Sequence, residues 1–318
     1  VGGALAAGCT ITIKPSEETP GTAIAIGRAF MEAGLPPGVL NIVFGVPSEV
    51  SEYLCSSNIP RKLSFTGSVP VGKHLQKLAA ENMIRCTMEL GGHSPLMVFN
   101  DTDIKKAAQI SVAGKFRNAG QVCVSPTRFL VQDDIKDKFT QAVIEETNKI
   151  KVGNGLEDDT NMGPLIAERR IDVMNDFVKD AIDSGANIEM GGNRMNRVGS
   201  FFSPTVMTGV DDSAKIMNEE PFGPLLPIDT FKSVDEVIDR ANRLDFGLAS
   251  YAFTNDPKIV DNLRSEIQAG LLAVNSTVVS TPETPFGGIK HSGYGSEGGV
   301  EGLEAFLVTR FVSETYNI

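Results

Sequence analysis

Cys123 has the sequence surroundings that best suit nucleophilic chemistry. It ends the segment Arg117–Cys123, which is polar, contains Gly120 and follows an apolar helical pattern. A structural cysteine usually lies in an apolar segment, and the other three cysteines of the chain fit that description. The thiolate is the reactive form of cysteine, so a loop cysteine among small polar residues is a candidate for covalent catalysis.

Glu89 is a candidate general base. It ends the apolar run Arg85–Glu89 and is followed by Gly91 and Gly92. Open α/β sheets bind ligands beyond the carboxyl ends of their strands, and a partly buried carboxylate there can take a proton from water. Position alone favours the simpler alternative, a solvated turn carboxylate, because Glu is mostly exposed in proteins.

The turn after Phe65 could hold a phosphate. The residues Thr66, Gly67 and Ser68 are small and lead into a predicted helix, so a pyrophosphate could approach the backbone at the helix N-terminus. This signal is weak by itself. The segment 293–298 matches the dinucleotide pattern G-x-G-x-x-G literally, but it follows no predicted strand and has acidic neighbours, so we reject it as a phosphate site.

Alternating strands and helices must position these residues. The first 90 residues predict strands at 10–13, 39–44, 62–65 and 85–89, and helices at 21–33, 48–55 and 71–81. Thr19 before Pro20 suits the N-cap and first position of the first helix. Such βαβ units imply a parallel sheet with both faces covered. A second α/β region follows Gly92, with strands at 95–99 and 128–131 and helices at 102–116 and 135–150.

Composition excludes several classes of function. The 318 residues carry a net charge of -11 with a pI near 4.9, which argues against a nucleic-acid partner. No apolar run reaches the roughly 20 residues that span a bilayer, so we expect a soluble protein without a membrane partner. Four scattered cysteines without a C-x-x-C pair, and three histidines, predict neither a disulfide framework nor a metal site. A reducing cytoplasm or organelle matrix fits best.

Taken in order, these segments resemble the aldehyde dehydrogenase superfamily, and most of all its succinate-semialdehyde dehydrogenases. The matching segments span nearly the whole chain: residues 13–20, 65–68, 89–95, 117–123, 219–224 and 285–293, with Asn275. The resemblance implies two Rossmann-like parallel-sheet domains. Residues 1–91 would be the C-terminal part of an NAD-binding domain, 92–289 a catalytic domain, and 290–318 a return segment with an oligomerisation strand at 306–316. A homodimer or homotetramer is then expected.

The resemblance also assigns chemical roles. The Cys123 thiolate would attack an aldehyde, a hydride would pass to the nicotinamide, and water activated by Glu89 would hydrolyse the thioester. Glu17 would repel a 2′-phosphate and favour NAD, whereas Lys14 leaves NADP as the second candidate. The residues implied in cofactor binding are Lys14, Ser16, Glu17, Gly45, Phe65, Gly67, Ser68, Leu90, Gly91, Glu220 and Phe222.

Three further positions match the substrate pocket of succinate-semialdehyde dehydrogenases: Arg117, Ser280 and Phe286. An Arg beside the nucleophile, with a hydroxyl across the pocket, would clamp a distal carboxylate. This implies succinate semialdehyde first and glutarate semialdehyde second, unless Arg117 pairs with a surface acid instead. Ser125 stands where some members carry a second cysteine, which excludes a redox disulfide with Cys123.

The chain opens with Val1 inside a helical pattern, so we expect an N-terminal part of the protein to precede it. We therefore expect the 318-residue piece alone to be inactive and poorly stable. The rival functions are a cysteine-dependent esterase, a non-catalytic homologue, and an aldehyde dehydrogenase for betaine, aliphatic or phosphorylated aldehydes. Arg117 discriminates among the aldehydes: if it points away from the pocket, the semialdehyde hypothesis fails.

Overall fold

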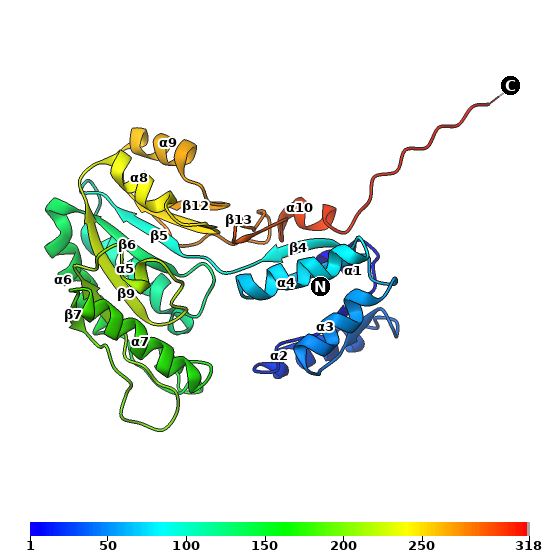
Figure 1. The fold of residues 1–318 in the computed structure, drawn as a ribbon, viewed down its shortest axis with the longest axis horizontal. Helices are drawn as coiled ribbons and strands as arrows, with labels where there is room; N and C mark the ends of the chain where they lie inside the picture. The colour runs from blue at the N-terminus through cyan, green and yellow to red at the C-terminus, as the bar shows by residue number, and fades with distance from the viewer. Residues whose placement is uncertain (317–318) are drawn as a thin grey trace.

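A seven-stranded sheet forms the core of the chain in the computed structural model, which describes residues 1–316 (Figure 1). Its strands run in the order β12-β11-β5-β6-β9-β8-β7 and are parallel except for β7. Their bounds are Ser94–Val98 for β5, Pro126–Gln132 for β6, Asn187–Met190 for β7, Thr205–Thr208 for β8, Leu225–Phe231 for β9, Ala249–Phe253 for β11 and Leu271–Val274 for β12.

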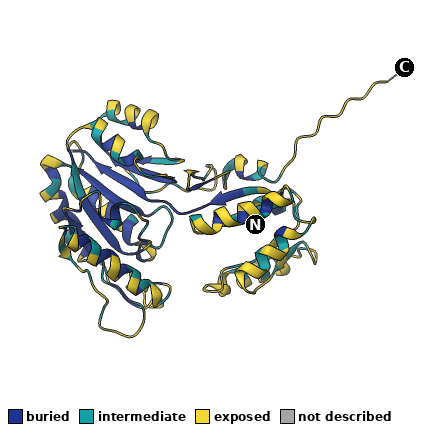
Figure 2. Cartoon of the chain, viewed as in Figure 1, coloured by how far each residue is buried: buried dark blue, intermediate teal, exposed yellow. Residues whose placement is uncertain are grey.

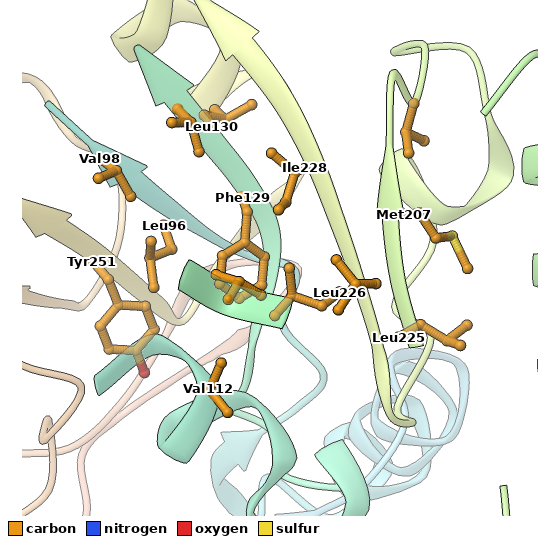
Figure 3. Close-up of a cluster of buried hydrophobic side chains, with 14 of the residues drawn as sticks. Leu96, Val98, Val112, Phe129, Leu130, Met207, Leu225, Leu226, Ile228 and Tyr251 are labelled. Carbon is orange, nitrogen blue, oxygen red and sulfur yellow. The ribbon is translucent and has the colours of Figure 1, made fainter. Parts of the chain in front are cut away.

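Continuous apolar strands explain why this sheet is covered on both faces. Every residue of β5 and β11 is buried, as expected where helices cover a parallel sheet on either side. Figure 3 shows Leu96, Phe129 and Tyr251 from three neighbouring strands gathered near Val112 of a covering helix. The helices of this region are α5 (Ile104–Phe116), α6 (Lys136–Thr147), α7 (Arg169–Asp183), α8 (Val234–Asn242) and α9 (Pro257–Glu266). In Figure 1, α8 and α9 lie on the opposite side of the sheet from α6 and α7.

The first 90 residues form a smaller α/β region. The strands β1 (Ile11–Ile13) and β2 (Leu40–Ile42) pair in parallel, and so do β3 (Lys62–Thr66) and β4 (Arg85–Glu89). The antiparallel strand β14 (Gly293–Tyr294) of the return segment is added beside β4. The helices here are α1 (Gly2–Ala6), α2 (Pro20–Glu32), α3 (Pro47–Ser56) and α4 (Val69–Glu81).

The expectation of one covered sheet in this region is wrong for the described residues. The strands form two separate small sheets, and α2 buries none of its residues. Ile24 and Ile26 of α2 are 40% and 41% exposed, and Figure 2 shows the contrast with the buried large sheet. Strands of three residues with one neighbour each offer too little surface to bury a helix face.

Local sequence signals predicted the bounds of most helices and strands to within a few residues of those in the structure. The predicted helix at 102–116 begins at Ile104, because the Asp103 side chain accepts a hydrogen bond from the Lys106 amide and caps it. Thr19 does occupy the N-cap of α2 before Pro20, but its side chain makes no capping hydrogen bond. Among residues 1–316, no helix is both long and apolar enough to cross a membrane.

The return segment packs through β14 against β4, the strand that ends at Glu89. A side chain at Gly293 would overlap the Met88 carbonyl, so this glycine allows two backbones to approach closely instead of holding a phosphate. Beyond α10 (Gly299–Glu304), residues 307–316 extend away from the body (Figure 1) and form no strand with the rest of the described chain. The predicted edge strand thus has no partner within residues 1–316, and pairing between subunits stays a prediction.

Candidate active site

A strained turn carries the candidate nucleophile. Helix α5 ends at Phe116, and the 3-10 turn η1 (Arg117–Gly120) follows with positive φ angles at Asn118 (51°) and Ala119 (56°). Gly120 also has a positive φ of 71°, and a side chain there would overlap the Gly223 carbonyl. Residues with side chains rarely adopt such φ values, and strain of this kind is found most often at functional sites.

Two side chains that sequence reasoning missed hold this turn. Gln121 accepts a hydrogen bond from the Ile166 amide (2.9 Å) and donates one to the Asn118 carbonyl (3.1 Å). The buried Tyr251 hydroxyl donates to the Val124 carbonyl at 2.5 Å. Neither has a sequence signal of its own, because each acts across a fold that brings distant segments together.

Cys123 lies partly buried beside two carboxylates. Burial raises the pKa of its thiol, and the charges of Glu220 and Glu89 raise it further. The segment after β4 also lies close to Cys123, because a side chain at Gly92 would come within 3.0 Å of the Cys123 carbonyl oxygen. The thiol is therefore protonated near neutral pH and needs a proton acceptor before it can attack.

Glu89 is the candidate general base of this site. It ends β4 opposite Gly293, is 4% exposed, and neither carboxyl oxygen has a hydrogen-bond partner within the described chain. Burial first, and then the negative charge of Glu297, raises its pKa to about 8. A carboxylate with that pKa is a competent general base at slightly alkaline pH. The solvated-turn alternative for Glu89 does not hold.

Glu220 reaches the same place from the segment before β9. Its Oε1 accepts a long hydrogen bond of 3.3 Å from the Gly92 amide, and its Oε2 fills the space that a side chain at Gly91 would need. Burial raises its pKa to about 7, against the lowering effects of Gly92, Lys115 and Arg170. Gly91 is thus required for the carboxylate to approach the backbone.

The β3–α4 turn adjoins this group. The Gly67 amide donates to the Glu89 carbonyl at 3.0 Å, and Ser68 is the N-cap of α4 without a side-chain cap bond. The Leu90 side chain lies over Gly72 of α4. Several predicted cofactor residues therefore cluster around Glu89: Phe65, Gly67, Ser68, Leu90, Gly91 and Glu220.

The predicted substrate residues fall in two places. Ser280 and Phe286 line one hollow with Glu297, and Phe286 exchanges two backbone hydrogen bonds of 2.7 Å with Glu297. Arg117 lies at the start of the nucleophile turn, where it and Cys123 both influence Tyr251 electrostatically. Within residues 1–316 Arg117 takes part in no ion pair, so the expected alternative of a surface salt bridge does not hold.

A loop cysteine, a buried carboxylate and a glycine-bound second carboxylate match the arrangement that the sequence resemblance implied. A family model described as the aldehyde dehydrogenase family matches residues 1–312. The chain belongs to the aldehyde dehydrogenase family. It is similar to the 4-(hydroxymethyl)benzenesulfonate dehydrogenase of Comamonas testosteroni (44% identity) and to the NADP(+) succinate-semialdehyde dehydrogenase of Escherichia coli strain K12 (40% identity).

These matches cover 98% of this chain but 65% and 64% of the two relatives, so the chain spans just under two thirds of their length. Among solved structures it resembles the succinate-semialdehyde dehydrogenase of Burkholderia pseudomallei, with a TM-score of 0.95 and 40% identity over 96% of this chain and 64% of that one. The aldehyde dehydrogenase fold and family predicted from sequence are both confirmed.

A second group of predicted cofactor residues follows β1 and β2 in this aldehyde dehydrogenase chain. Lys14 and Glu17 form an exposed ion pair of 2.5 Å after β1, and that pairing lowers the pKa of Glu17. The Ser16 hydroxyl accepts from the Glu18 amide, and Gly45 follows β2. No strand pairing among residues 1–316 joins β1 and β2 to the β3–β4 sheet. Phe222 lies nearer the site, beside Glu220, with a strained φ of 44°.

Proposed function

We propose that this chain carries the catalytic centre of an NAD(P)-dependent aldehyde dehydrogenase, with Cys123 as the nucleophile and Glu89 as the base. The observation that supports this best is the placement of two carboxylates from distant segments near the Cys123 thiol. The carboxylates of Glu220 and Glu89 both raise the pKa of the Cys123 thiol, and Glu89 is buried without a hydrogen-bond partner among residues 1–316. Perturbed groups gathered in this way mark functional sites more often than structural ones.

In the first step the Cys123 thiolate attacks the aldehyde carbon. A C–S bond forms as the carbonyl electron pair moves to oxygen, after the thiol has lost its proton to water. The chemistry that bound NAD(P) supplies is acceptance of a hydride from this adduct, which leaves a thioester on Cys123.

In the second step Glu89 takes a proton from water while the water oxygen attacks the thioester carbonyl. The C–S bond then breaks, which releases the carboxylic acid and regenerates the Cys123 thiolate. A pKa of about 8 suits this role, because the base must be ionised for part of the population and still hold a proton well.

The cofactor would lie against the Glu89–Gly92 segment. Ionised Glu220 can accept hydrogen bonds from a ribose diol, the glycines leave room there, and Phe222 offers an exposed ring beside it. We propose NAD as the preferred cofactor because Glu17 would repel a 2′-phosphate. NADP remains the second candidate, since Lys14 neutralises that charge and the similar Escherichia coli enzyme is named for NADP(+).

The substrate is proposed to be a short aldehyde with a distal carboxylate, succinate semialdehyde first and glutarate semialdehyde second. Arg117 is exposed, is free of ion pairs within the described chain and begins the turn that leads to Cys123, so its guanidinium could bind an anion. Two similar enzymes are named for a carboxylate or a sulfonate compound, which supports an anionic substrate in either case. Ser280 and Phe286 would contribute the other side of the pocket.

The deciding experiment measures kcat/KM for succinate semialdehyde and propionaldehyde in the protein as its natural gene encodes it, with NAD and with NADP. Arg117→Ala should lower kcat/KM for the acid alone, by roughly tenfold or more since a charge-assisted bond is lost. Arg264→Ala, which removes an exposed arginine, is the matched control and should change neither value. Equal turnover of both aldehydes by the unaltered protein would refute the semialdehyde assignment and leave the dehydrogenase standing.

We also propose a homodimer or homotetramer in a reducing cytoplasm. The extended residues 307–316 present exposed apolar side chains, including Val308 and Phe311, and have open backbone groups that suit strand addition. Light scattering before and after deletion of residues 307–318 tests this, and an unchanged mass would refute the role of the tail.

A further inference from the structure

Lys115 is a buried cation that the proposed chemistry does not use. It lies in the last turn of α5, is 0% exposed, and its Nζ has no hydrogen-bond partner among residues 1–316. Burial of an unpaired ammonium group is strongly unfavourable, so such a residue normally has a neighbour that compensates.

Glu220 is the neighbour of opposite charge. The end of α5 lies beside the segment that carries Glu220, because a side chain at Gly120 would meet the carbonyl oxygens of both Gly223 and Lys115. The two groups form no direct ion pair in the described chain, yet Glu220 raises the pKa of Lys115 while burial lowers it to about 7. The reverse effect holds at Glu220, whose pKa Lys115 lowers. His93, at the connection into β5, also faces Lys115, and burial lowers its pKa so far that it is neutral.

Other groups around Glu220 are already engaged. Arg170 of α7 donates to the Pro221 carbonyl at 2.6 Å and to the Phe222 carbonyl at 3.3 Å, so its guanidinium is partly committed to the backbone. The Gly92 amide supplies one long hydrogen bond of 3.3 Å. Cys123 has a raised pKa and is uncharged near neutral pH. Lys115 is therefore the side chain left to balance the Glu220 charge from within the core.

We propose that Lys115 is a positioning residue that keeps the Glu220 carboxylate ionised and directed at Gly91 and Gly92, and so sets the affinity for the dinucleotide. This inference rests on the proposed function, because it takes Glu220 as the acceptor for a ribose diol. Only an ionised carboxylate can accept hydrogen bonds from both hydroxyls without donating one itself. The buried ammonium never touches the ligand and acts through Glu220.

The test is the pH dependence of NAD binding, measured by calorimetry between about pH 6 and 9, in the natural protein and in Lys115→Met. Loss of the cation should shift the ionisation of Glu220 to higher pH. The dissociation constant at pH 7 should therefore rise roughly two- to fivefold, the ratio of ionised fractions when a pKa of about 7 moves up by about one half to one pH unit. The difference should shrink by pH 9, where Glu220 is ionised and Lys115 neutral in the natural protein. The value of kcat at saturating NAD should change little.

A double-mutant cycle separates this role from general damage. In Glu220→Gln, further replacement of Lys115 by Met should have no added effect on NAD affinity, because the charge it supports is gone. Ser111→Ala removes another buried, unbonded polar group from the same helix and is the matched control. Lys115→Gln serves as the second variant if Lys115→Met does not fold.

The outcomes are distinguishable. An unchanged pH midpoint in the Lys115 variants, or additive effects of the Lys115 and Glu220 substitutions, would overturn the positioning role while the dehydrogenase proposal stood. Failure of the natural protein to bind either NAD or NADP would overturn the proposed function, and the role of Lys115 with it.

Discussion

Replacing Glu89 with Gln should stop hydrolysis of the acyl-enzyme and leave the first turnover nearly intact. Gln has the same shape but cannot accept the proton of the attacking water. General-base catalysis contributes about 100- to 10,000-fold, so the steady-state rate should fall by that order. The thioester on Cys123 should then accumulate, because its formation is complete before hydrolysis begins.

The pH dependence of the steady-state rate in the natural protein is a second test of Glu89 as the base. With a pKa of about 8, Glu89 is ionised in about a tenth of molecules at pH 7 and about nine tenths at pH 9. Where hydrolysis limits turnover, the steady-state rate should therefore rise roughly ninefold over that interval. The raised pKa of Cys123 also favours high pH, but it affects the rate of the first turnover, which is measured separately.

Rapid mixing of enzyme, NAD and aldehyde, followed at the absorbance of NADH, resolves the two phases. Glu89→Gln should show a burst on the order of one NADH per site and then a very slow phase, the signature of acyl-enzyme accumulation. The exposed Glu52→Gln is a control for the loss of one negative charge and should behave as the natural protein. Natural steady-state turnover in Glu89→Gln, with its pH dependence retained, would refute the assignment of the base.

Three further outcomes concern stability and packing. The pKa of Glu89 is about 8 in the folded chain and near 4.5 in the unfolded chain, so its contribution to stability is complete below pH 4.5 and is lost as pH rises through about 8. In urea unfolding at pH 9, Glu89→Gln should be more stable than the natural protein by about 2 kcal/mol, after discounting for solvent access. At pH 5 the substitution should bring no gain in stability. Gly120→Ala should lower the unfolding free energy by at least about 2 kcal/mol, because the new side chain would overlap a backbone carbonyl and the φ angle is positive. Gly155→Ala is the control and should be near neutral, because a side chain there would contact no other described atom. Equal losses of stability in the two variants would contradict the reasoning. Tyr251→Phe removes the hydroxyl that donates to the Val124 carbonyl and should lower the unfolding free energy by about 1 to 3 kcal/mol in the same assay. Acylation should also be slower. A variant with the stability and the rate of the natural protein would show that this hydrogen bond does not hold the nucleophile turn.

Local sequence signals identified most elements and the two catalytic candidates. The apolar run that ends at Glu89 predicted β4, and the polar segment before Cys123 predicted a loop after α5, and both lie where expected. Such signals are readable because strands, helices and turns are decided largely by nearby residues. The motifs from residue 13 to residue 293 then indicated the aldehyde dehydrogenase family.

The state of each site group was decided only by the tertiary structure. Glu220 lies 128 residues from Gly92 along the chain, and nothing in its acidic local sequence predicts that it is bound at a pair of glycines. The pKa values of Glu89 and Lys115 depend on burial by segments from the far ends of the chain, among them β14 beside Glu89. The separation of β1 and β2 from β3 and β4 likewise depends on which strands are neighbours. Sequence determines which residues are available for chemistry, whereas desolvation and charge proximity depend on long-range packing, and these set protonation at the site.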